Sequence, residues 1–375
     1  MEALKMLSQK LTLDHSIFFT PEKIAREQKE KIEPARGKLL IASCRSGAYL
    51  AEKVVKEYKQ LLSQNNSKGE VLYLSDIDRN FKDSETGVTL EKHVSGYDVF
   101  LFQALLDPTS NRGVDQNYMA LLIGARAFKE HGANHVTAVA PYLAYARQDR
   151  PTTFKREPTT AKLMADLAIE AGIDRIVAWD VHSGQSRGFY GNIPVNMLDS
   201  LTLFIKLLKK FRRKENVILV APDAGAAKHI TLLGQALDLK CAIASKHRPK
   251  PEEAIIEEII GDFKNKTTAI IIDDMISSGD TIYEVVKKLI EKKGIDEIYL
   301  GISHNLCIPV AKLKLEEMHK IHHLQKVYIT NSIPQTEAFH NLNFIQEICL
   351  SEILARTINR IHYNKSVSEV FYKPK

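Results

Sequence analysis

Residues 267–282 read Thr-Thr-Ala-Ile-Ile-Ile-Asp-Asp-Met-Ile-Ser-Ser-Gly-Asp-Thr-Ile. The apolar run 269–272 predicts a strand buried on both faces of a parallel sheet. Asp273 and Asp274 come next, and a turn of small residues, 277–281, leads into a helical pattern. Because the first N–H groups of a helix have no partner within it, this arrangement predicts a phosphate site at the carboxyl end of the strand. The two carboxylates only accept hydrogen bonds and suit sugar hydroxyls or magnesium. The alternative is that they only cap the next helix.

The composition describes an ordinary globular protein. The 375 residues are enough for two domains, and the formal charge of +6 argues weakly for anionic substrates and hardly at all for nucleic acid. The four cysteines, Cys44, Cys241, Cys307 and Cys349, form no CxxC pair, so neither a disulfide framework nor a zinc site is expected. No apolar stretch approaches the roughly 20 residues that cross a bilayer, so we expect no membrane association. A cytoplasmic location fits these features.

Strand and helix patterns alternate from Lys38 onward, which predicts an α/β protein with parallel sheets. Strands are predicted at 38–43, 70–74, 98–103, 135–140, 175–180, 217–222, 240–244, 268–273 and 297–303. Helices are predicted at 48–62, 116–131, 159–171, 252–260 and 281–293. The count is too large for one sheet. We therefore expect two lobes, each a mainly parallel sheet flanked by helices, with an N-terminal extension (1–36), a first lobe (37–198), a second lobe (199–344) and a final helix and tail (345–375).

Several stretches in a fixed order carry a resemblance to a known family. The stretch 267–282 resembles the ribose-5-phosphate and 5-phosphoribosyl 1-diphosphate (PRPP) signature of ribose-phosphate pyrophosphokinases, also called PRPP synthetases, and more loosely that of phosphoribosyltransferases. The other stretches resemble the pyrophosphokinases alone: 80–86, 139–150, 180–189, 220–228 and 245–250. The resemblance runs from about Lys38 to Phe371, and it implies two tandem phosphoribosyltransferase-like lobes, with the final helix packed on the first one.

The resemblance implies ATP-binding residues in the first lobe. Arg147 and Gln148 lie on the loop that is similar to the family's ATP loop. Phe81, Asp83 and Glu85 match a hairpin whose aromatic ring stacks on adenine, and in relatives this hairpin serves a neighbouring subunit. A homo-oligomer, such as a hexamer, is therefore implied.

The resemblance also implies the metal and catalytic residues. Mg²⁺ is the expected cofactor, with His182, Asp223 and Asp180 as candidate ligands. From the extended backbone around them we expect Asp180 and His182 to share one face, and Asp223 has the alternative role of a helix N-cap. Lys246 and Arg248 match the Lys-x-Arg pair of the family's flexible catalytic loop, where two cations stabilise charge on the polyphosphate.

The ribose-5-phosphate site implied by the resemblance comprises Arg248, Asp273, Asp274, Ser277, Ser278, Gly279, Asp280 and Thr281. The chain departs from the family pattern at several positions. Ser277 stands where Asp is common and Asp280 where Gly is common, while Asn192 and Asn196 replace acids and Ser84 replaces Gly in the hairpin. A carboxylate at 280 would face the 5-phosphate unless it turns back onto the helix N-terminus.

These motifs together predict synthesis of PRPP by transfer of the diphosphoryl group of Mg-ATP to ribose 5-phosphate. A PRPP-consuming phosphoribosyltransferase would explain 267–282 but not the ATP loop, the His182 region or the 246–248 pair. A catalytically weak, synthetase-like regulatory subunit is the remaining alternative, which the departures at Ser277 and Asp280 favour somewhat.

Overall fold

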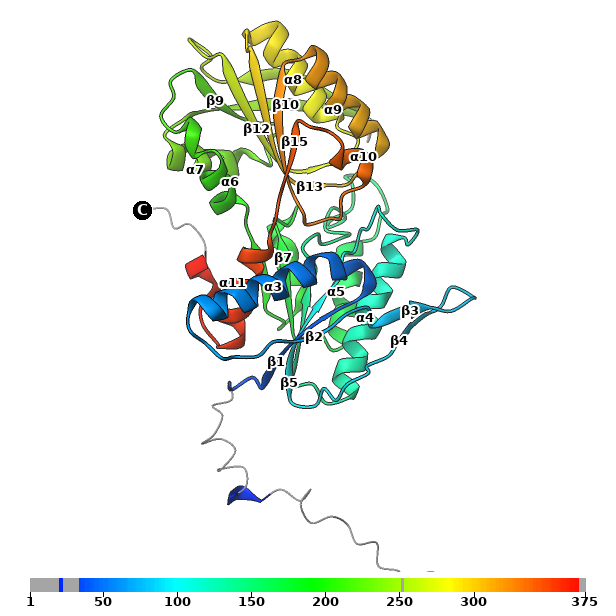
Figure 1. Cartoon of the computed structure of the whole chain (residues 1–375). Coiled ribbons are helices and arrows are strands. Elements are labelled where there is room, and N and C mark those ends of the chain that lie inside the picture. Colours follow the sequence, from blue (N-terminus) through cyan, green and yellow to red (C-terminus); the bar gives the residue numbers. More distant parts are fainter. Residues whose placement is uncertain (1–19, 23–33, 251–252, 371–375) are drawn as a thin grey trace, which may run out of the picture.

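The computed structural model describes residues 20–22, 34–250 and 253–370, with side chains left out for 246–255. Its chain forms two α/β lobes, one above the other in Figure 1. The predicted extension (1–36) lies mostly outside the described residues. Within the described part, no helix combines the length and apolar character needed to cross a bilayer.

The first lobe is a parallel sheet with the strand order β2-β1-β5-β6-β7-β8. Its strands are β1 (Lys38–Ser43), β2 (Leu72–Leu74), β5 (Tyr97–Phe102), β6 (His135–Val139), β7 (Arg175–Trp179) and β8 (Val195–Leu198). A separate antiparallel hairpin pairs β3 (Asp78–Asn80) with β4 (Thr86–Val88). The helical segments are η3 (Arg45–Gly47), α3 (Ala48–Gln64), α4 (Val114–Glu130), α5 (Thr160–Glu170) and η4 (Gly184–Tyr190).

The second lobe is a mostly parallel sheet with the order β11-β10-β9-β12-β13-β14-β15, in which only the β10–β11 pair is antiparallel among the described strands. Its strands are β9 (Val217–Ala221), β10 (Lys240–Lys250), β11 (Glu253–Ile260), β12 (Thr268–Ile276), β13 (Glu297–Asn305), β14 (Leu324–Thr330) and β15 (Ile345–Ile348). Its helical segments are α6 (Leu201–Leu207), η5 (Lys209–Phe211), α7 (Ala227–Leu237), α8 (Asp280–Lys293), α9 (Pro309–Ile321) and α10 (Glu337–His340). After β15 the chain forms α11 (Ser351–His362) and η6 (Val367–Val370).

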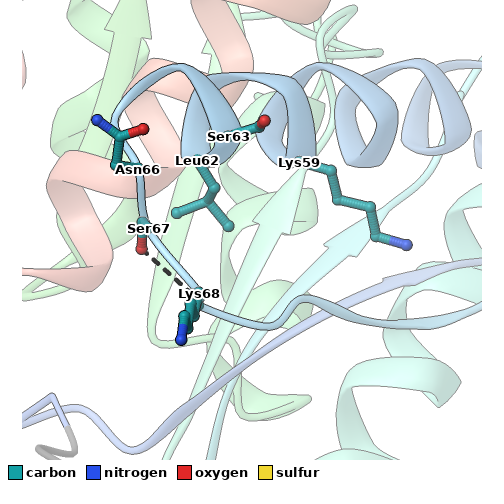
Figure 2. A pocket seen from close by; sticks show the side chains of 7 residues that line it. Lys59, Leu62, Ser63, Asn66, Ser67 and Lys68 are labelled. Carbon is teal, nitrogen blue, oxygen red and sulfur yellow. Dashed lines mark hydrogen bonds between the residues drawn. The ribbon is translucent and has the colours of Figure 1, made fainter.

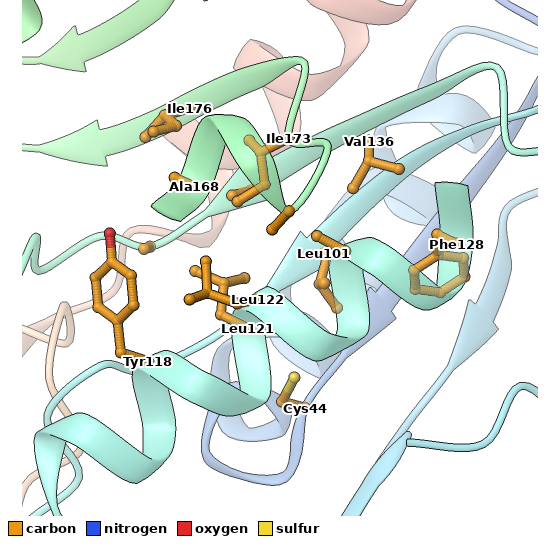
Figure 3. Packing of buried hydrophobic residues seen from close by; sticks show 14 of the residues in the cluster. Cys44, Leu101, Tyr118, Leu121, Leu122, Phe128, Val136, Ala168, Ile173 and Ile176 are labelled. Carbon is orange, nitrogen blue, oxygen red and sulfur yellow. The ribbon is translucent and has the colours of Figure 1, made fainter. Parts of the chain in front are cut away.

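Successive side chains of each central strand point to opposite faces of the sheet, so each sheet has a hydrophobic core on both faces. On β5, Leu101 packs against α4 and α5, whereas Phe100 points to the opposite face, toward α3 and α11. Figure 3 shows the first of these cores, where Leu101 and Val136 from the sheet meet Leu121 of α4. On β12, residues 269 and 271 face α8 and α9 while 270 and 272 face α6 and α7, so this strand is buried on both faces as its apolar run predicts.

Helix α11 belongs to the first lobe although it follows the last strand of the second. It lies beside α3, where Leu354 and Ile358 join the core under β1 and β5 (Figure 1). A buried ionic cluster holds its end: Arg36 Nε and Nη2 donate to the two oxygens of Asp98, each at 3.0 Å, and His362 Nδ1 lies 2.9 Å from Asp98 Oδ2. After the last strand of the second lobe, the chain thus crosses back and packs on the first lobe.

Two sequence predictions of secondary structure are wrong. Residues 252–260 were expected to be a helix after a charged loop, but β10 continues to Lys250 and pairs with β11 in an antiparallel hairpin. This pairing gives the backbone hydrogen-bond partners that a helix would otherwise supply, and the isoleucines suit a strand. The final helix was expected from about Ile345, yet residues 345–348 form β15, the edge strand beside β14, and α11 starts at Ser351.

Candidate active site between the two lobes

The acid pair lies within the carboxyl-terminal part of β12 rather than after it. The strand continues to Ile276, and Asp273 stands opposite Ile302 of β13. Burial and repulsion from the Asp274 and Asp223 carboxylates raise the pKa of Asp273 well above its usual range. The charges of Asp274 and Asp223 therefore act on Asp273 at one end of the second sheet, and a bound cation or a hydroxyl donor would offset this repulsion.

The first lobe reaches this carboxylate cluster through His182. Its Nδ1 lies 2.5 Å from Asp274 Oδ2, and because a carboxylate only accepts, the nitrogen carries the proton and donates it. This hydrogen bond raises the pKa of His182. Burial disfavours the charged form of Asp274, but the His182 hydrogen bond and the nearby His182 and His304 charges together outweigh burial and lower the pKa of Asp274. The predicted metal motif and the predicted ribose motif thus meet across the lobe boundary.

Asp180 does not share a face with His182, which corrects the expectation from an extended backbone. Its φ is 43°, in the left-handed region, so the chain turns between the two residues. The Asp180 carboxylate accepts the hydroxyl protons of Ser200, at 2.7 Å, and of Ser303 on β13. Asp180 therefore joins the lobes through Oδ2, and its metal-binding role stays a prediction.

Two other positions weighed for metal binding have local structural partners. Asp223 follows β9, and its Oδ1 accepts the backbone N–H groups of Gly225 at 2.9 Å and Ala226 at 3.3 Å. These hydrogen bonds close the turn before α7, but the alternative role as a helix N-cap is wrong, because Ala226 is the N-cap residue of α7. The negative charge of Asp223 acts on Asp273. Asn196, at a position where the family has an acid, lies in β8 and accepts a hydrogen bond from Arg175 Nη1 at 2.7 Å.

The predicted ATP loop lies beside this junction. Arg147 and Gln148 are exposed on the loop that follows β6, and the Gln148 backbone is held by Tyr145 and Ala161. The positive charge of Arg147 opposes protonation of His182, which places the guanidinium within electrostatic reach of that ring. Arg147, His182 and Asp274 thus share one region between the lobes.

The turn from β12 into α8 has the form of an anion cradle. Gly279 has φ 80°, a conformation that favours glycine, and it precedes Asp280, the first residue of α8. The Asp280 carboxylate accepts hydrogen bonds from the Ser278 hydroxyl and from Lys314 Nζ of α9. Turning back onto the helix N-terminus was the condition under which the sequence made this carboxylate tolerable, and Lys314 is a partner that no motif indicated.

Lys246 and Arg248 are on the β10 strand, not on a loop, because β10 extends to Lys250. Register shifts after Ser245 and after His247 interrupt its pairing with β11. The side chains of Lys246 and Arg248 lie outside the described residues, so their catalytic role stays a prediction.

The hairpin expected to bind adenine projects outward from the first lobe (Figure 1). Phe81 at its tip is 48% exposed, and its ring lies under the guanidinium of Arg79, 5.2 Å from the centroid. Asp83 and Glu85 are also exposed. Ser84, which stands where the family has Gly, adopts φ 76°, so this turn keeps the backbone that glycine would favour.

Sequence reasoning missed His304. It is buried beside the junction, with Nε2 3.0 Å from the Trp179 carbonyl oxygen and Nδ1 2.8 Å from Ser332 Oγ. Burial lowers the pKa of His304. A polar Ser-His-Asn run at the carboxyl end of a predicted strand, 303–305, was the signal that could have found it.

A surface pocket of about 390 Å³ lies away from this junction, at the C-terminal end of α3 (Figure 2). It contains none of the predicted site residues; its lining is Lys59, Leu62, Ser63, Asn66, Ser67, Lys68 and Gly69. The carbonyl end of a helix carries partial negative charge. The two lysines that line the pocket therefore do not make the pocket suitable for phosphate.

Comparison with known proteins places this geometry in a family. Residues 39–172 match the N-terminal domain of ribose phosphate pyrophosphokinase, and residues 235–372 match the phosphoribosyl synthetase-associated domain. The chain is 36% identical over 294 residues to the ribose-phosphate pyrophosphokinase of Fusobacterium nucleatum, which covers 78% of this chain and 89% of that protein. It belongs to the ribose-phosphate pyrophosphokinase family. Ribose-phosphate pyrophosphokinase A of Dictyostelium discoideum is likewise 36% identical, covering 78% of this chain and 88% of the relative.

A solved pyrophosphokinase structure agrees with the fold. The phosphoribosylpyrophosphate synthetase of Mycobacterium smegmatis superposes with a TM-score of 0.74 at 29% identity, covering 87% of this chain and 99% of that chain. The family predicted from the motifs, the two-lobed α/β fold and the enzyme class are thereby confirmed.

Proposed function

We propose that the chain transfers the diphosphoryl group of Mg-ATP to the anomeric hydroxyl of ribose 5-phosphate, giving PRPP and AMP. The observation that carries the proposal is the contact between His182 and Asp274 across the lobes, at 2.5 Å. It joins the predicted metal candidate of the first lobe, which lies near Arg147 of the predicted ATP loop, to a predicted ribose residue of the second lobe. Such a reaction depends on holding the O1 nucleophile in line with the β-phosphorus and on neutralising charge.

The second lobe would bind ribose 5-phosphate. The 277–281 turn takes the 5-phosphate at the start of α8, and Asp273 and Asp274 accept the ring hydroxyls. Hydrogen bonds from the ribose hydroxyls would offset part of the repulsion that raises the pKa of Asp273. Lys246 and Arg248 would act on the diphosphoryl group from the adjacent hairpin.

The carboxylate-rich junction fits Mg²⁺. No three His, Cys, Asp or Glu side chains converge as a ready cage in the described part of the chain. Mg²⁺ is generally held by one or two carboxylates, with waters and substrate phosphates completing its shell, so a full protein cage is not required. Asp223 and His182 are the candidate protein ligands. Bound there with ATP, the ion would supply charge neutralisation at the transferring group.

The outward hairpin supports a role in a homo-oligomer, since an exposed Phe81 ring gains a partner when it meets a nucleotide site on a second copy. Mixing Phe81→Ala subunits with Lys246→Ala subunits should restore part of the activity, because some sites then combine two intact halves. No rescue in demonstrably mixed oligomers would mean that each chain completes its own site. A cytoplasmic location stays a prediction.

Calorimetric titration of Asp273→Asn tests the assignment of substrates to lobes. We expect weaker binding of ribose 5-phosphate and an affinity for a non-hydrolysable ATP analogue, with magnesium, within a few-fold of wild type. Loss of ATP-analogue binding with ribose 5-phosphate binding intact would mean that the two substrates are assigned to the wrong lobes.

A further inference from the structure

The phosphate turn of this chain contains a carboxylate that opposes its ligand. Asp280 is the first residue of α8, directly after Gly279, at the end of the helix where a phosphate would bind. A carboxylate has no proton to donate at neutral pH and repels a phosphate dianion at short range. Binding of ribose 5-phosphate therefore needs something that neutralises Asp280 and fixes its direction.

Lys314 of α9 meets both needs. Its Nζ donates to Asp280 Oδ1, while the Ser278 hydroxyl donates to Oδ2, so both carboxylate oxygens are held. The lysine side chain is only 20% exposed. Its stem packs on the turn itself: a Cβ placed on Gly279 would lie 3.7 Å from Lys314 Cδ and 3.8 Å from the Ala311 Cα. The cation is thus positioned by packing as well as by charge.

We infer that Lys314 is a positioning residue for the 5-phosphate of ribose 5-phosphate. It pairs with Asp280, holds that carboxylate toward α9, and leaves the start of α8 to the phosphate. Ser278, whose hydroxyl is donated to Asp280, then contributes its backbone rather than its hydroxyl to the cradle. This inference rests on the proposed function.

A double-mutant cycle measures the coupling. Ribose 5-phosphate is titrated by calorimetry into wild type, Lys314→Met, Lys314→Arg, Asp280→Gly and the Lys314→Met/Asp280→Gly double variant. Methionine keeps most of the packed stem and removes the charge. We expect Lys314→Met to weaken binding roughly 10-fold, about 1.4 kcal/mol, and Lys314→Arg to restore most of it. In the Asp280→Gly background, Lys314→Met should change the affinity by no more than about 2-fold.

The control is Lys312→Met on the same helix, where Lys312 pairs with Glu316 at 2.8 Å. It should leave ribose 5-phosphate binding unchanged, and all variants should bind a non-hydrolysable ATP analogue like wild type. Equal losses from Lys314→Met with and without Asp280, or no loss at all, would overturn the inference while wild-type binding upholds the proposed function. Failure of wild type to bind ribose 5-phosphate would overturn both.

Discussion

Removal of the Arg36 guanidinium should lower the free energy of unfolding of the first lobe, because it breaks a buried ion pair. The Asp98 side chain is fully buried and that of Arg36 is 10% exposed, and two 3.0 Å hydrogen bonds join them. Deleting one partner of a buried pair costs about 3–5 kcal/mol. His362 remains beside Asp98 in Arg36→Met, so we expect the lower end, about 3 kcal/mol, out of a total stability of roughly 5–15 kcal/mol.

Denaturant unfolding followed by tryptophan fluorescence measures this loss, since Trp179, the single tryptophan, is fully buried in the same core as α3 and α11. The matched control is Arg356→Met on α11, where Arg356 pairs with Glu352 and both side chains are about half exposed. An exposed helical pair contributes about 0.3–0.5 kcal/mol. Equal losses in the two variants would refute the reasoning that burial sets the magnitude.

Three further predictions follow from single positions. Ser84→Gly removes a Cβ at φ 76° and should stabilise the protein by up to about 1 kcal/mol in denaturant unfolding; destabilisation would contradict a strained turn. Lys246→Ala should lose about 2–4 kcal/mol of transition-state stabilisation in kcat with little change in ATP affinity, and a near-normal kcat would remove the residue from the mechanism. Burial opposes the charge on Asp280, but hydrogen bonds from Lys314 and Ser278 outweigh it and lower its pKa. This stabilisation is present above the pKa of an unfolded Asp and is lost as pH falls through the lower pKa of folded Asp280. Carboxyl NMR should show that the pKa of Asp280 rises in Lys314→Met. An unchanged pKa would contradict the pairing.

The central strand and the order of the motifs could be predicted because their signals are local. The run 269–272 is apolar at every position, which leaves a strand buried on both faces as the simplest solution. The strand at residues 253–260 could not be predicted from a local signal. Their Ile pairs recur at helical spacing, and antiparallel pairing with β10, a long-range contact, decides for a strand.

Local motifs could predict which residues to consider for the site, but not how those residues are arranged. His182 and Asp274 are 92 positions apart, and their contact depends on how the two lobes meet. Lys314 has no motif around it, and only the packing of α9 on the Gly279 turn brings it to Asp280. Asp180 was given the wrong neighbours because a left-handed φ at a non-glycine residue has no strong sequence signal.

The most direct test of the proposed function is turnover by the purified protein alone. ATP, magnesium and ribose 5-phosphate are incubated with it, and the products are followed by phosphorus NMR and nucleotide chromatography. Transfer of the diphosphoryl group predicts AMP and PRPP in equal amounts, with ADP absent from the products. Formation of ADP with a singly phosphorylated sugar would indicate an ordinary kinase. If the protein alone gives no turnover but stimulates an active synthetase subunit when the two are mixed, it is a regulatory subunit, and the proposal is contradicted.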